Sequence, residues 1–218
     1  MTLTVITEAG PANAECRLLL AHGAGAGINS PFFETITPLL VARGIAVTAF
    51  EFAYMATRRT GGSRRPPPKA ETLIPEYRDV VRSLAKRASG AKLVIGGKSM
   101  GGRVASLVAD DLYKTREIDG LVCLGYPFHP PNTPEKLRTA HLEVLSCPAL
   151  IVQGERDPFG SRAEVEALSL PPAIGFRWIG DGDHDFGPRG RSGFTRKGNL
   201  ADVADAVAAF IADLPQPR

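Results

Sequence analysis

Apolar stretches typical of buried strands alternate along this chain with stretches whose apolar residues recur at helical spacing. The strand-like stretches cover residues 16–22, 45–52, 92–97, 118–126, 147–157 and 174–180. The helical stretches cover residues 31–44, 71–88, 100–114, 133–142, 161–170 and 199–214, with Asn199 as a candidate N-cap of the last helix. Such alternation is typical of βαβ units, in which helices cover both faces of a mostly parallel sheet. We therefore predict an α/β fold, built as a single domain over residues 1–218.

Composition narrows the class of protein further. The net charge is +3, and no apolar run approaches the roughly 20 residues that a membrane-spanning helix needs. The first ten residues lack the basic and apolar regions of a secretory signal. Three cysteines lack metal-ligand spacing, and their odd number argues against a disulfide framework: Cys16, Cys123 and Cys147. We expect a cytoplasmic protein with reduced core cysteines, no metal, no cofactor and no membrane insertion.

The positive charge is concentrated in two segments. Residues 56–69 hold five basic side chains and residues 187–198 hold four, and neither segment contains an acid. The loop TRRTGGSRRPPPK, residues 57–69, carries three consecutive prolines, which stiffen it and exclude a helix. It is long for a connection between a strand and a helix, which indicates a functional role. Two interpretations stay open: the basic loops bind an anionic ligand, or they are solvated surface.

The stretch IGGKSMGGRVASL, residues 95–107, carries glycines in an arrangement that two kinds of site share. A phosphate-binding loop requires G-x-x-x-x-G-K-[ST], and its first glycine would have to stand where the chain has Lys92. The preceding residues also resemble a strand and leave no loop to wrap a phosphate. The turn HGAGAG, residues 22–27, does not match the dinucleotide-binding pattern G-x-G-x-x-G. The position of the third glycine is occupied by Ile28 if the pattern starts at residue 23, and by Ser30 if it starts at residue 25. The sequence therefore argues against both kinds of phosphate site.

The same stretch fits a nucleophile elbow, the sharp strand-to-helix turn that presents a reactive serine. A predicted strand runs into Ser99, and a predicted helix follows it directly. Chains come close together at such a turn, so small residues are needed two positions before and two after the serine. Gly97 and Gly101 meet that need. A serine that only caps a helix is the alternative, but the strand–turn–helix setting favours Ser99 as a nucleophile.

A serine nucleophile needs a base to accept its proton and an acid to orient that base. Around such an elbow the chain order is serine, acid, histidine. Of the four histidines only His184 follows the strand that would carry the acid. That strand ends in Asp157, which precedes a proline and fits a turn at the carboxyl edge of the sheet, and Glu155 is the alternative acid. We expect three aspartates near the histidine to be polar loop residues that tune or solvate it: Asp181, Asp183 and Asp185.

An oxyanion hole completes such a site. One donor is expected from the backbone N–H after the nucleophile, which belongs to Met100. The second is expected from the loop after an early strand, where the Ala24 N–H is our candidate and that of Gly25 the alternative. Glycines in this turn let the backbone approach a substrate oxygen closely. We interpret His22 as a structural residue that holds the turn.

These segments occur in the order found in the α/β-hydrolase superfamily, which the chain resembles over nearly its whole length. The segments are the elbow GKSMGG, the turn LLLAHGAGAG, Asp157 in QGERDPFG and His184 in GDGDHDF. The chain most resembles a small bacterial group of hydrolases similar to dienelactone-hydrolase-like enzymes. That group is related to a hydrolase-like domain of a eukaryotic chromatin-complex subunit and of a testis-expressed protein. The resemblance implies the α/β-hydrolase fold and a triad of Ser99, His184 and Asp157.

Two departures from better-known relatives qualify this resemblance. A dienelactone hydrolase carries cysteine at the nucleophile position, where this chain has Ser99, so a dienelactone is not implied as the substrate. Many esterases and lipases insert a lid after the strand 118–126. Here only PFHPPN, residues 127–132, separates that strand from the next predicted helix. We therefore expect a minimal form of the fold, without a large lid domain and with an open site.

Two functions follow as hypotheses. The first is a serine hydrolase that cleaves a small ester or thioester through an acyl-enzyme, with a preference for anionic substrates if the basic loops flank the site. Four residues are expected to contact the substrate: Arg58, Arg59, Gly25 and Tyr126. The second is a non-catalytic binding module that uses the loops 56–69 and 187–198. Few aromatic residues interrupt these loops, which argues against nucleic acid as the partner, and the oligomeric state stays open.

Overall fold

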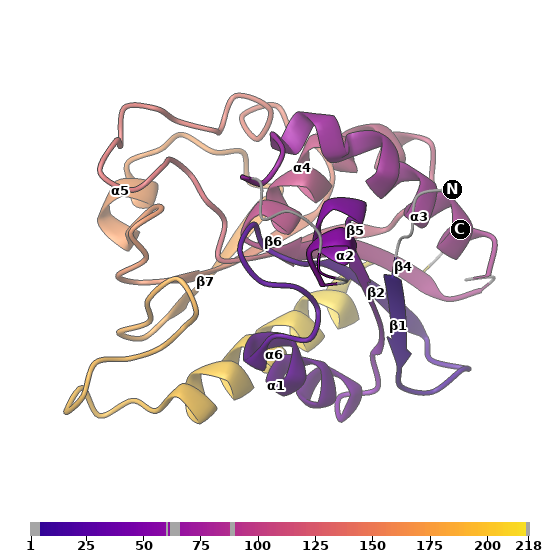
Figure 1. Cartoon of the computed structure of the whole chain (residues 1–218), viewed down its shortest axis with the longest axis horizontal. Helices are drawn as coiled ribbons and strands as arrows, with labels where there is room; N and C mark the ends of the chain where they lie inside the picture. Colours follow the sequence, from indigo (N-terminus) through magenta and orange to yellow (C-terminus); the bar gives the residue numbers. More distant parts are fainter. Residues whose placement is uncertain (1–4, 60, 62–65, 88–89, 217–218) are drawn as a thin grey trace.

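The computed structural model describes residues 5–59, 61, 66–87 and 90–216 of the chain. Within these ranges seven strands form one sheet (Figure 1). They are β1 (Val5–Ala9), β2 (Cys16–Ala21), β3 (Ala46–Glu51), β4 (Lys92–Lys98), β5 (Gly120–Leu124), β6 (Ala149–Gly154) and β7 (Ile174–Ile179). Their spatial order is β1-β3-β2-β4-β5-β6-β7. β1 runs antiparallel to β3, and all other neighbouring strands pair in parallel.

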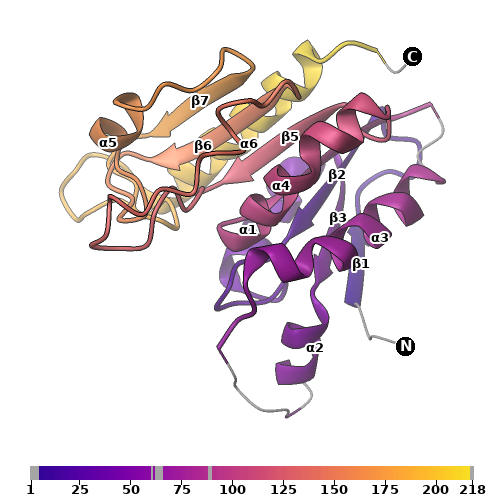
Figure 2. The same ribbon diagram turned by 90° about the horizontal axis from the view of Figure 1, so that it is seen from above.

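Helices cover both faces of this sheet, as predicted (Figures 1 and 2). α1 (Pro31–Val41) and α6 (Arg196–Asp213) pack on one face, and α3 (Ile74–Ala85) and α4 (Met100–Lys114) pack on the other. Three shorter helices lie in the connections: α2 (Ala53–Arg59), the 3-10 helix η1 (Ala70–Leu73) and α5 (Arg162–Glu166). Two cores of buried apolar side chains result, one on each face. Burial of this apolar surface is the main force that stabilises such a layered fold.

The parallel strands bring the loops that follow them to one edge of the sheet. β4 ends at Lys98, β6 at Gly154 and β7 at Ile179, and the pairing of these strands is parallel from β2 through β7. The turns after β2, β4, β6 and β7 therefore meet at the carboxyl edge, where open α/β sheets bind their ligands. All four segments that the sequence singled out lie in these turns.

One strand was not predicted. β1 pairs with β3 at the outer edge of the sheet, from Val5 opposite Glu51 to Ala9 opposite Val47. Its sequence, VITEA, has five residues and little apolar periodicity, and Ile6 is 40% exposed. A short edge strand of this kind depends on its neighbour for order, so its own sequence gives a weak signal.

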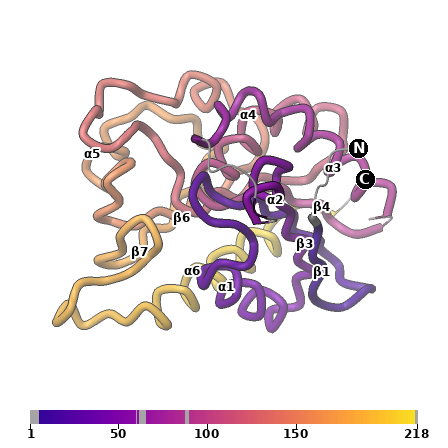
Figure 3. Tube along the Cα trace, viewed as in Figure 1, coloured from indigo at the N-terminus to yellow at the C-terminus, as the bar shows by residue number. Residues whose placement is uncertain are grey.

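The predicted helix over 133–142 is absent. Turns replace it, with the Thr133 N–H donating to the Pro130 carbonyl (3.2 Å) and the Lys136 N–H to the Thr133 carbonyl (3.0 Å). The Arg138 N–H donates to the Phe128 carbonyl (2.7 Å), which draws this segment back onto the preceding chain. Figure 3 shows the resulting path between β5 and β6 as irregular loops. The described part of this connection contains no helical lid domain.

Two predictions about helix boundaries were wrong. α6 begins at Arg196, and the Thr195 Oγ1 accepts from the Gly198 N–H (3.0 Å) in the capping position expected for Asn199. Asn199 lies inside the helix instead, and its Nδ2 donates to two carbonyl oxygens of the preceding loop. The segment 57–69 was expected to contain no helix, yet α2 extends to Arg59. The prolines that exclude a helix lie later, at residues 66–68, and Arg64 and Arg65 lie outside the described residues.

Candidate active site

Ser99 occupies a sharp turn between β4 and α4. Its backbone has φ 52° and ψ −116°, a conformation that L-residues rarely adopt. The flanking glycines make the turn possible. A Cβ on Gly97 would lie 2.6 Å from the Ala21 carbonyl oxygen, and one on Gly101 would lie 2.6 Å from the His22 carbonyl oxygen. Both distances are shorter than real Cβ contacts, so larger residues at 97 or 101 would push the backbone of β2 away from the turn.

A continuous line of hydrogen bonds joins Ser99 to two side chains far away in the sequence. The Ser99 Oγ lies 2.9 Å from His184 Nε2, and His184 Nδ1 lies 2.8 Å from Asp157 Oδ2. His184 is partly exposed, with 21% of its side chain accessible, whereas Asp157 is fully buried. The ring of Phe159 packs against the imidazole with centroids 4.4 Å apart. The fold therefore brings together the three residues that the sequence singled out as nucleophile, base and acid.

Asp157 is fixed by further hydrogen bonds, and the alternative acid points elsewhere. The Phe159 N–H donates to Asp157 Oδ1 (2.9 Å), in the turn after β6. Glu155 accepts from the Asp181 N–H (2.9 Å) and pairs with Arg162 (3.2 Å). Its carboxylate is thus engaged in holding the loop that follows β7, and Asp157 is the acid next to His184.

Gln153 is a buried residue of this site that the sequence reasoning missed. Its Oε1 accepts from the Tyr126 N–H (2.7 Å). Its Nε2 lies 3.0 Å from Asp157 Oδ2 and 3.1 Å from the Tyr126 and Gly160 carbonyl oxygens. One amide thereby connects the acid to the ends of β5 and β6. The signal was present, since Gln153 is a polar residue within the otherwise apolar run ALIVQG.

The loop that carries His184 is shaped by two of its own aspartates. Asp183 Oδ1 accepts from the N–H groups of Asp185 (2.9 Å) and Gly187 (2.8 Å), which closes a tight turn around the histidine. Asp181 Oδ1 lies 2.8 Å from the Nε atoms of both Arg156 and Arg189. The hydrogen bond from Arg189, aided by the Arg156 charge, lowers the pKa of Asp181 to about 2. These contacts hold both ends of the loop.

The turn after β2 lies directly against Ser99. A Cβ on Gly23 would stand 3.5 Å from the Ser99 Cβ. His22 Nε2 accepts from the Phe52 N–H (3.1 Å), so the ring proton sits on Nδ1, which donates to the Gly23 carbonyl (2.5 Å). The peptide bond that follows is trans, so the Ala24 N–H points the opposite way from that carbonyl. Burial lowers the pKa of His22 to about 4, and the neutral ring holds this turn as predicted.

Met100 is the first residue of α4, and its N–H belongs to the first turn of the helix. Such N–H groups have no acceptor within their own helix, and the positive end of the helix dipole lies beside them. The candidate donors Met100 and Ala24 thus belong to two segments that both border Ser99.

The four residues expected to contact a substrate differ in their positions. Gly25 lies exposed in the turn after β2. Arg58 packs over the Tyr54 ring (5.2 Å) and reaches the Ala24 carbonyl (3.5 Å) from α2. Arg59 pairs with the buried Glu51 (3.4 Å), which offsets its charge. The prediction for Tyr126 was wrong with respect to its side chain, which is fully buried and donates to the Arg138 carbonyl (2.9 Å).

The three cysteines and His141 do not take part in the line of hydrogen bonds from Ser99 to Asp157. All three cysteines are buried free thiols, and burial raises the pKa of Cys16 and of Cys147 to about 12. His141 bonds to Ser106 Oγ (2.8 Å), and burial lowers its pKa to about 4.

Across the described ranges no group of three or more His, Cys, Asp or Glu side chains is arranged to hold a metal ion. Among the same residues no helix is both long and apolar enough to cross a membrane.

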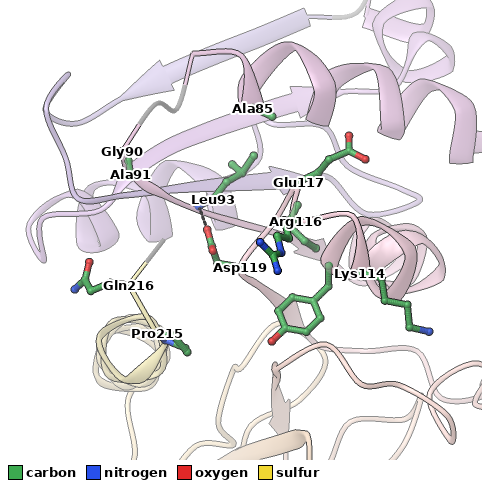
Figure 4. A pocket seen from close by; sticks show the side chains of 12 residues that line it. Ala85, Gly90, Ala91, Leu93, Lys114, Arg116, Glu117, Asp119, Pro215 and Gln216 are labelled. Carbon is green, nitrogen blue, oxygen red and sulfur yellow. Dashed lines mark hydrogen bonds between the residues drawn. The ribbon is translucent and has the colours of Figure 1, made fainter. Parts of the chain in front are cut away.

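A cavity of about 480 Å³ lies elsewhere in the molecule (Figure 4). Leu93 from the start of β4, Asp119 from the approach to β5 and Pro215 after α6 contribute to its lining. Asp119 accepts from the Leu93 N–H there (2.7 Å). Because β4 spans seven residues, this cavity lies about 20 Å from Ser99, at the opposite edge of the sheet. It is separate from the site around His184.

Comparison with known proteins agrees with this architecture. A family model described as "Alpha/beta hydrolase domain" matches residues 14–212. The chain belongs to the alpha/beta hydrolase family. Its fold resembles a dienelactone hydrolase from Anabaena variabilis, with a TM-score of 0.74, 20% identity, and 98% and 93% of the two chains covered.

Two serine hydrolase structures are also similar. An alpha-beta serine hydrolase homologue from Coxiella burnetii has a TM-score of 0.68 and 18% identity, covering 94% of this chain and 89% of that one. A serine hydrolase without a lid from Xanthomonas campestris has a TM-score of 0.65 and 16% identity, covering 99% and 91%. The predicted minimal alpha/beta hydrolase fold is thus confirmed.

Proposed function

We propose that this alpha/beta hydrolase is a serine hydrolase that cleaves small esters or thioesters through an acyl-enzyme. The observation that carries this proposal is the unbroken line of hydrogen bonds from Ser99 through His184 to the buried Asp157. The arrangement suits a neutral imidazole whose Nδ1–H donates to Asp157 and whose Nε2 accepts from the Ser99 hydroxyl. A serine held in this way is ready to lose its proton as it attacks.

The proposed reaction proceeds in two halves. Ser99 Oγ attacks the substrate carbonyl carbon while His184 Nε2 takes the hydroxyl proton, and the carbonyl becomes a tetrahedral oxyanion. The imidazolium then gives that proton to the leaving alcohol or thiol, whose bond to the carbonyl carbon breaks. In the second half water attacks the acyl-enzyme, with His184 again as the base. The proton returns to Ser99 as the acid product leaves.

The backbone donors act on the oxyanion in both halves. We assign this role to the N–H groups of Met100 and Ala24, which border Ser99 from α4 and from the turn after β2. Donors of this kind are fixed before the reaction starts, and removing one typically costs 100- to 1,000-fold in kcat. The hydrogen bond from His22 to the Gly23 carbonyl supports this role, because it holds the adjoining peptide in one orientation.

The connection between β5 and β6 and the nearby arginines support the proposed class of substrate. The absence of a helical lid between β5 and β6 in the described residues favours compact substrates over long acyl chains. A preference for anionic substrates rests on Arg58, which lies next to Ala24. Glu51 and Asp181 offset the charges of Arg59 and Arg189.

Steady-state hydrolysis of p-nitrophenyl acetate and of an acetyl thioester tests the proposal. We expect turnover by the wild-type protein and a loss of at least about 1,000-fold in kcat for Ser99→Ala and for His184→Gln. Asp157→Asn should lose a comparable factor, while Glu155→Gln, the matched carboxylate variant, should retain activity within about tenfold. Turnover that survives Ser99→Ala would contradict the proposal, as would a well-folded wild-type protein that hydrolyses neither substrate.

A further inference from the structure

Lys98 is a buried cation that the proposed reaction does not use. It is the last residue of β4, directly before Ser99, and only 8% of its side chain is exposed. Its Nζ pairs with Asp185 Oδ1 at 3.2 Å and lies 5.6 Å from the centre of the Phe32 ring. Burying an ammonium group is unfavourable by several kcal/mol unless its partners compensate. Packing alone does not explain why the Lys98 ammonium is buried next to Ser99.

The Lys98 ammonium lies beside the imidazole of His184. A Cβ built on Gly125, at the end of β5, would stand 3.2 Å from Lys98 Nζ and 3.4 Å from His184 Nδ1. The two nitrogens therefore both lie close to the same point in the structure, beside Gly125. Gly125 also has φ 66°, which favours glycine there. The lysine belongs to the end of β4, and the histidine belongs to the loop after β7.

Lys92, at the other end of the same strand, shows what a structural buried lysine looks like in this fold. It is 6% exposed, and its Nζ donates to the carbonyl oxygens of Ile211 (3.0 Å) and Leu214 (2.6 Å). These contacts tie β4 to the end of α6. Lys98 differs because its anionic partner, Asp185, directly follows His184 in the sequence. A contact from Lys98 is therefore a contact with the loop that carries the base.

We propose that Lys98 is a positioning residue: its ion pair with Asp185 docks the His184 loop onto the end of β4 and balances the charge next to the imidazole. This inference rests on the proposed function, because it assigns the role of the base to His184. Lys98 acts through Asp185 and touches no reacting atom. Its ammonium disfavours a second positive charge on the nearby imidazole, whereas the Asp185 carboxylate favours one.

Charged groups on several elements act on the imidazole or on Asp185. Asp157 contacts the imidazole from the turn after β6, and Asp183 and Asp185 belong to the imidazole's own loop. The Arg196 charge at the start of α6 acts on Asp185. Lys98 supplies the positive charge from β4. Burial lowers the pKa of Lys98, while Asp185 opposes that shift. Burial raises the pKa of Asp185, but Lys98, His184 and Arg196 together outweigh this and lower it overall, with Lys98 contributing most. Each member of the pair therefore favours the charged form of the other.

The test compares Lys98→Met, Asp185→Asn and the double variant with Lys92→Met as the matched control. Asp185 is 55% exposed, so its variant is expected to fold even if Lys98→Met does not. Three quantities are measured: kcat and KM for p-nitrophenyl acetate, the pH midpoint of kcat/KM, and the pH midpoint of the His184 ring resonances by NMR. The NMR signal is assigned with His184→Gln and needs no turnover.

We expect Lys98→Met and Asp185→Asn each to lower kcat at least tenfold with KM changed less than threefold. The pH midpoint should rise by about one unit in Lys98→Met, which leaves Asp185 unbalanced, and should fall in Asp185→Asn. The double variant should return close to the wild-type midpoint. Lys92→Met should lower the melting temperature and leave the midpoint unchanged.

Two results would overturn the inference. One is a wild-type kcat and wild-type midpoint in Asp185→Asn, whether or not Lys98→Met folds. The other is a Lys98→Met variant that behaves like Lys92→Met and loses only stability. If the wild-type protein hydrolyses nothing, the proposed function fails, yet opposite shifts of the NMR midpoint would still support the charge balance. The two failures are therefore distinguishable.

Discussion

At the scale of single residues, the site depends on places where only a small side chain fits. Ser99 adopts φ 52°, and the chain around it approaches β2 so closely that Gly97 and Gly101 leave no room for a Cβ. The neighbouring atoms are backbone carbonyls, which cannot rotate away as a flexible side chain would. The reactive turn therefore depends on the path of the backbone, and that path requires glycine at positions 97 and 101.

Gly101→Ala tests whether the turn around Ser99 requires glycine at this position. Its Cβ would meet the carbonyl oxygens of Ala21 and His22, so we expect a loss of about 2–3 kcal/mol in the free energy of unfolding. Urea denaturation measures the loss. Gly190→Ala is the matched control, because a Cβ there meets nothing within 4 Å, and it should change stability by less than about 0.5 kcal/mol. Equal stability of the two variants would show that the turn tolerates a larger residue.

His22 gives a prediction about pH. Burial lowers its pKa from 6.5 to about 4, so the unfolded chain binds more protons than the folded one between these values. Stability from this group is complete above pH 6.5 and is lost as the pH falls through 4. We expect His22→Gln to be less stable than wild type at pH 7. Its stability should fall less steeply between pH 7 and 5, by up to about 1.4 kcal/mol per pH unit.

His141→Gln is the matched comparison for this experiment. Burial lowers the pKa of His141 to about 4 as well, so its variant should flatten the same pH window in urea denaturation. His141 does not contact the Gly23 carbonyl, however, so ester hydrolysis should fall in His22→Gln and be retained in His141→Gln. An unchanged slope in both variants would contradict neutral buried histidines in the folded state.

The sequence predicted some of these residues better than others. Ser99, Gly97 and Gly101 were predictable because the elbow is a local pattern within five residues. Asp157 and His184 were predictable from chain order alone, since each follows a recognisable strand. Gln153 and Lys98 were harder to predict. Gln153 stands out as a polar residue in an apolar run, but the role of each residue comes from a partner that only the folded chain brings near: Asp157 for Gln153 and Asp185 for Lys98. The prediction for Tyr126 was wrong because the sequence at the end of a strand does not show whether an aromatic side chain points into the core or toward the site.

At the scale of elements, the loop over residues 180–187 is the most elaborately fixed part of the site. Asp183 closes its turn, and Asn199 in α6 donates to the carbonyls of Gly180 (3.1 Å) and Phe186 (2.8 Å). Asp181 anchors its start through Arg156 and Arg189. A loop held at both ends by buried contacts can keep the imidazole of His184 in one place.

Asp181→Asn should loosen this loop and alter the acid stability of the protein. The folded pKa of Asp181 is about 2, lowered chiefly by the hydrogen bond from Arg189, against an ordinary value of 3.8. Its contribution to stability is therefore complete above about pH 4 and is lost as the pH falls through about 2. We expect Asp181→Asn to melt at a lower temperature at pH 7 and to lose less stability than wild type between pH 5 and pH 2.5.

Thermal unfolding followed by circular dichroism measures both effects. Asp79→Asn serves as the control, since Asp79 is 78% exposed and forms a surface pair with Arg82 at 3.7 Å. Such pairs contribute little to stability, so this variant should behave as wild type at each pH. A wild-type melting curve for Asp181→Asn would show that the loop does not depend on this carboxylate.

The elements themselves were predicted unevenly, for physical reasons. The central strands β2 to β6 are mostly apolar and almost entirely buried. α4 was predicted with its observed bounds because its glycine start and apolar face are both strong signals. The segment 133–142 has helical spacing but forms turns, because the Arg138 N–H bonds to the Phe128 carbonyl. The local cap from Thr195 starts α6 at Arg196, three residues before the predicted cap, and the Asn199 side chain bonds to the preceding loop instead.

At the scale of the whole molecule, parallel strand pairing assembles the site. The turns after β4, β6 and β7 supply Ser99, Asp157 and His184, and the carboxyl ends of these strands meet at one edge of the sheet. Residues 85 positions apart in the sequence thereby come within a hydrogen bond of each other. The helices cover both faces of the sheet (Figure 2), and at this edge Ser99 and His184 are partly exposed.

The most direct test of the account is covalent labelling of the purified protein with a fluorophosphonate probe, followed by mapping of the adduct by mass spectrometry. We predict a single adduct on Ser99, no labelling of Ser99→Ala, and labelling at least about 100-fold slower in His184→Gln. A well-folded wild-type protein that stays unlabelled, or one labelled on another residue, would contradict the assignment of Ser99 as an activated nucleophile.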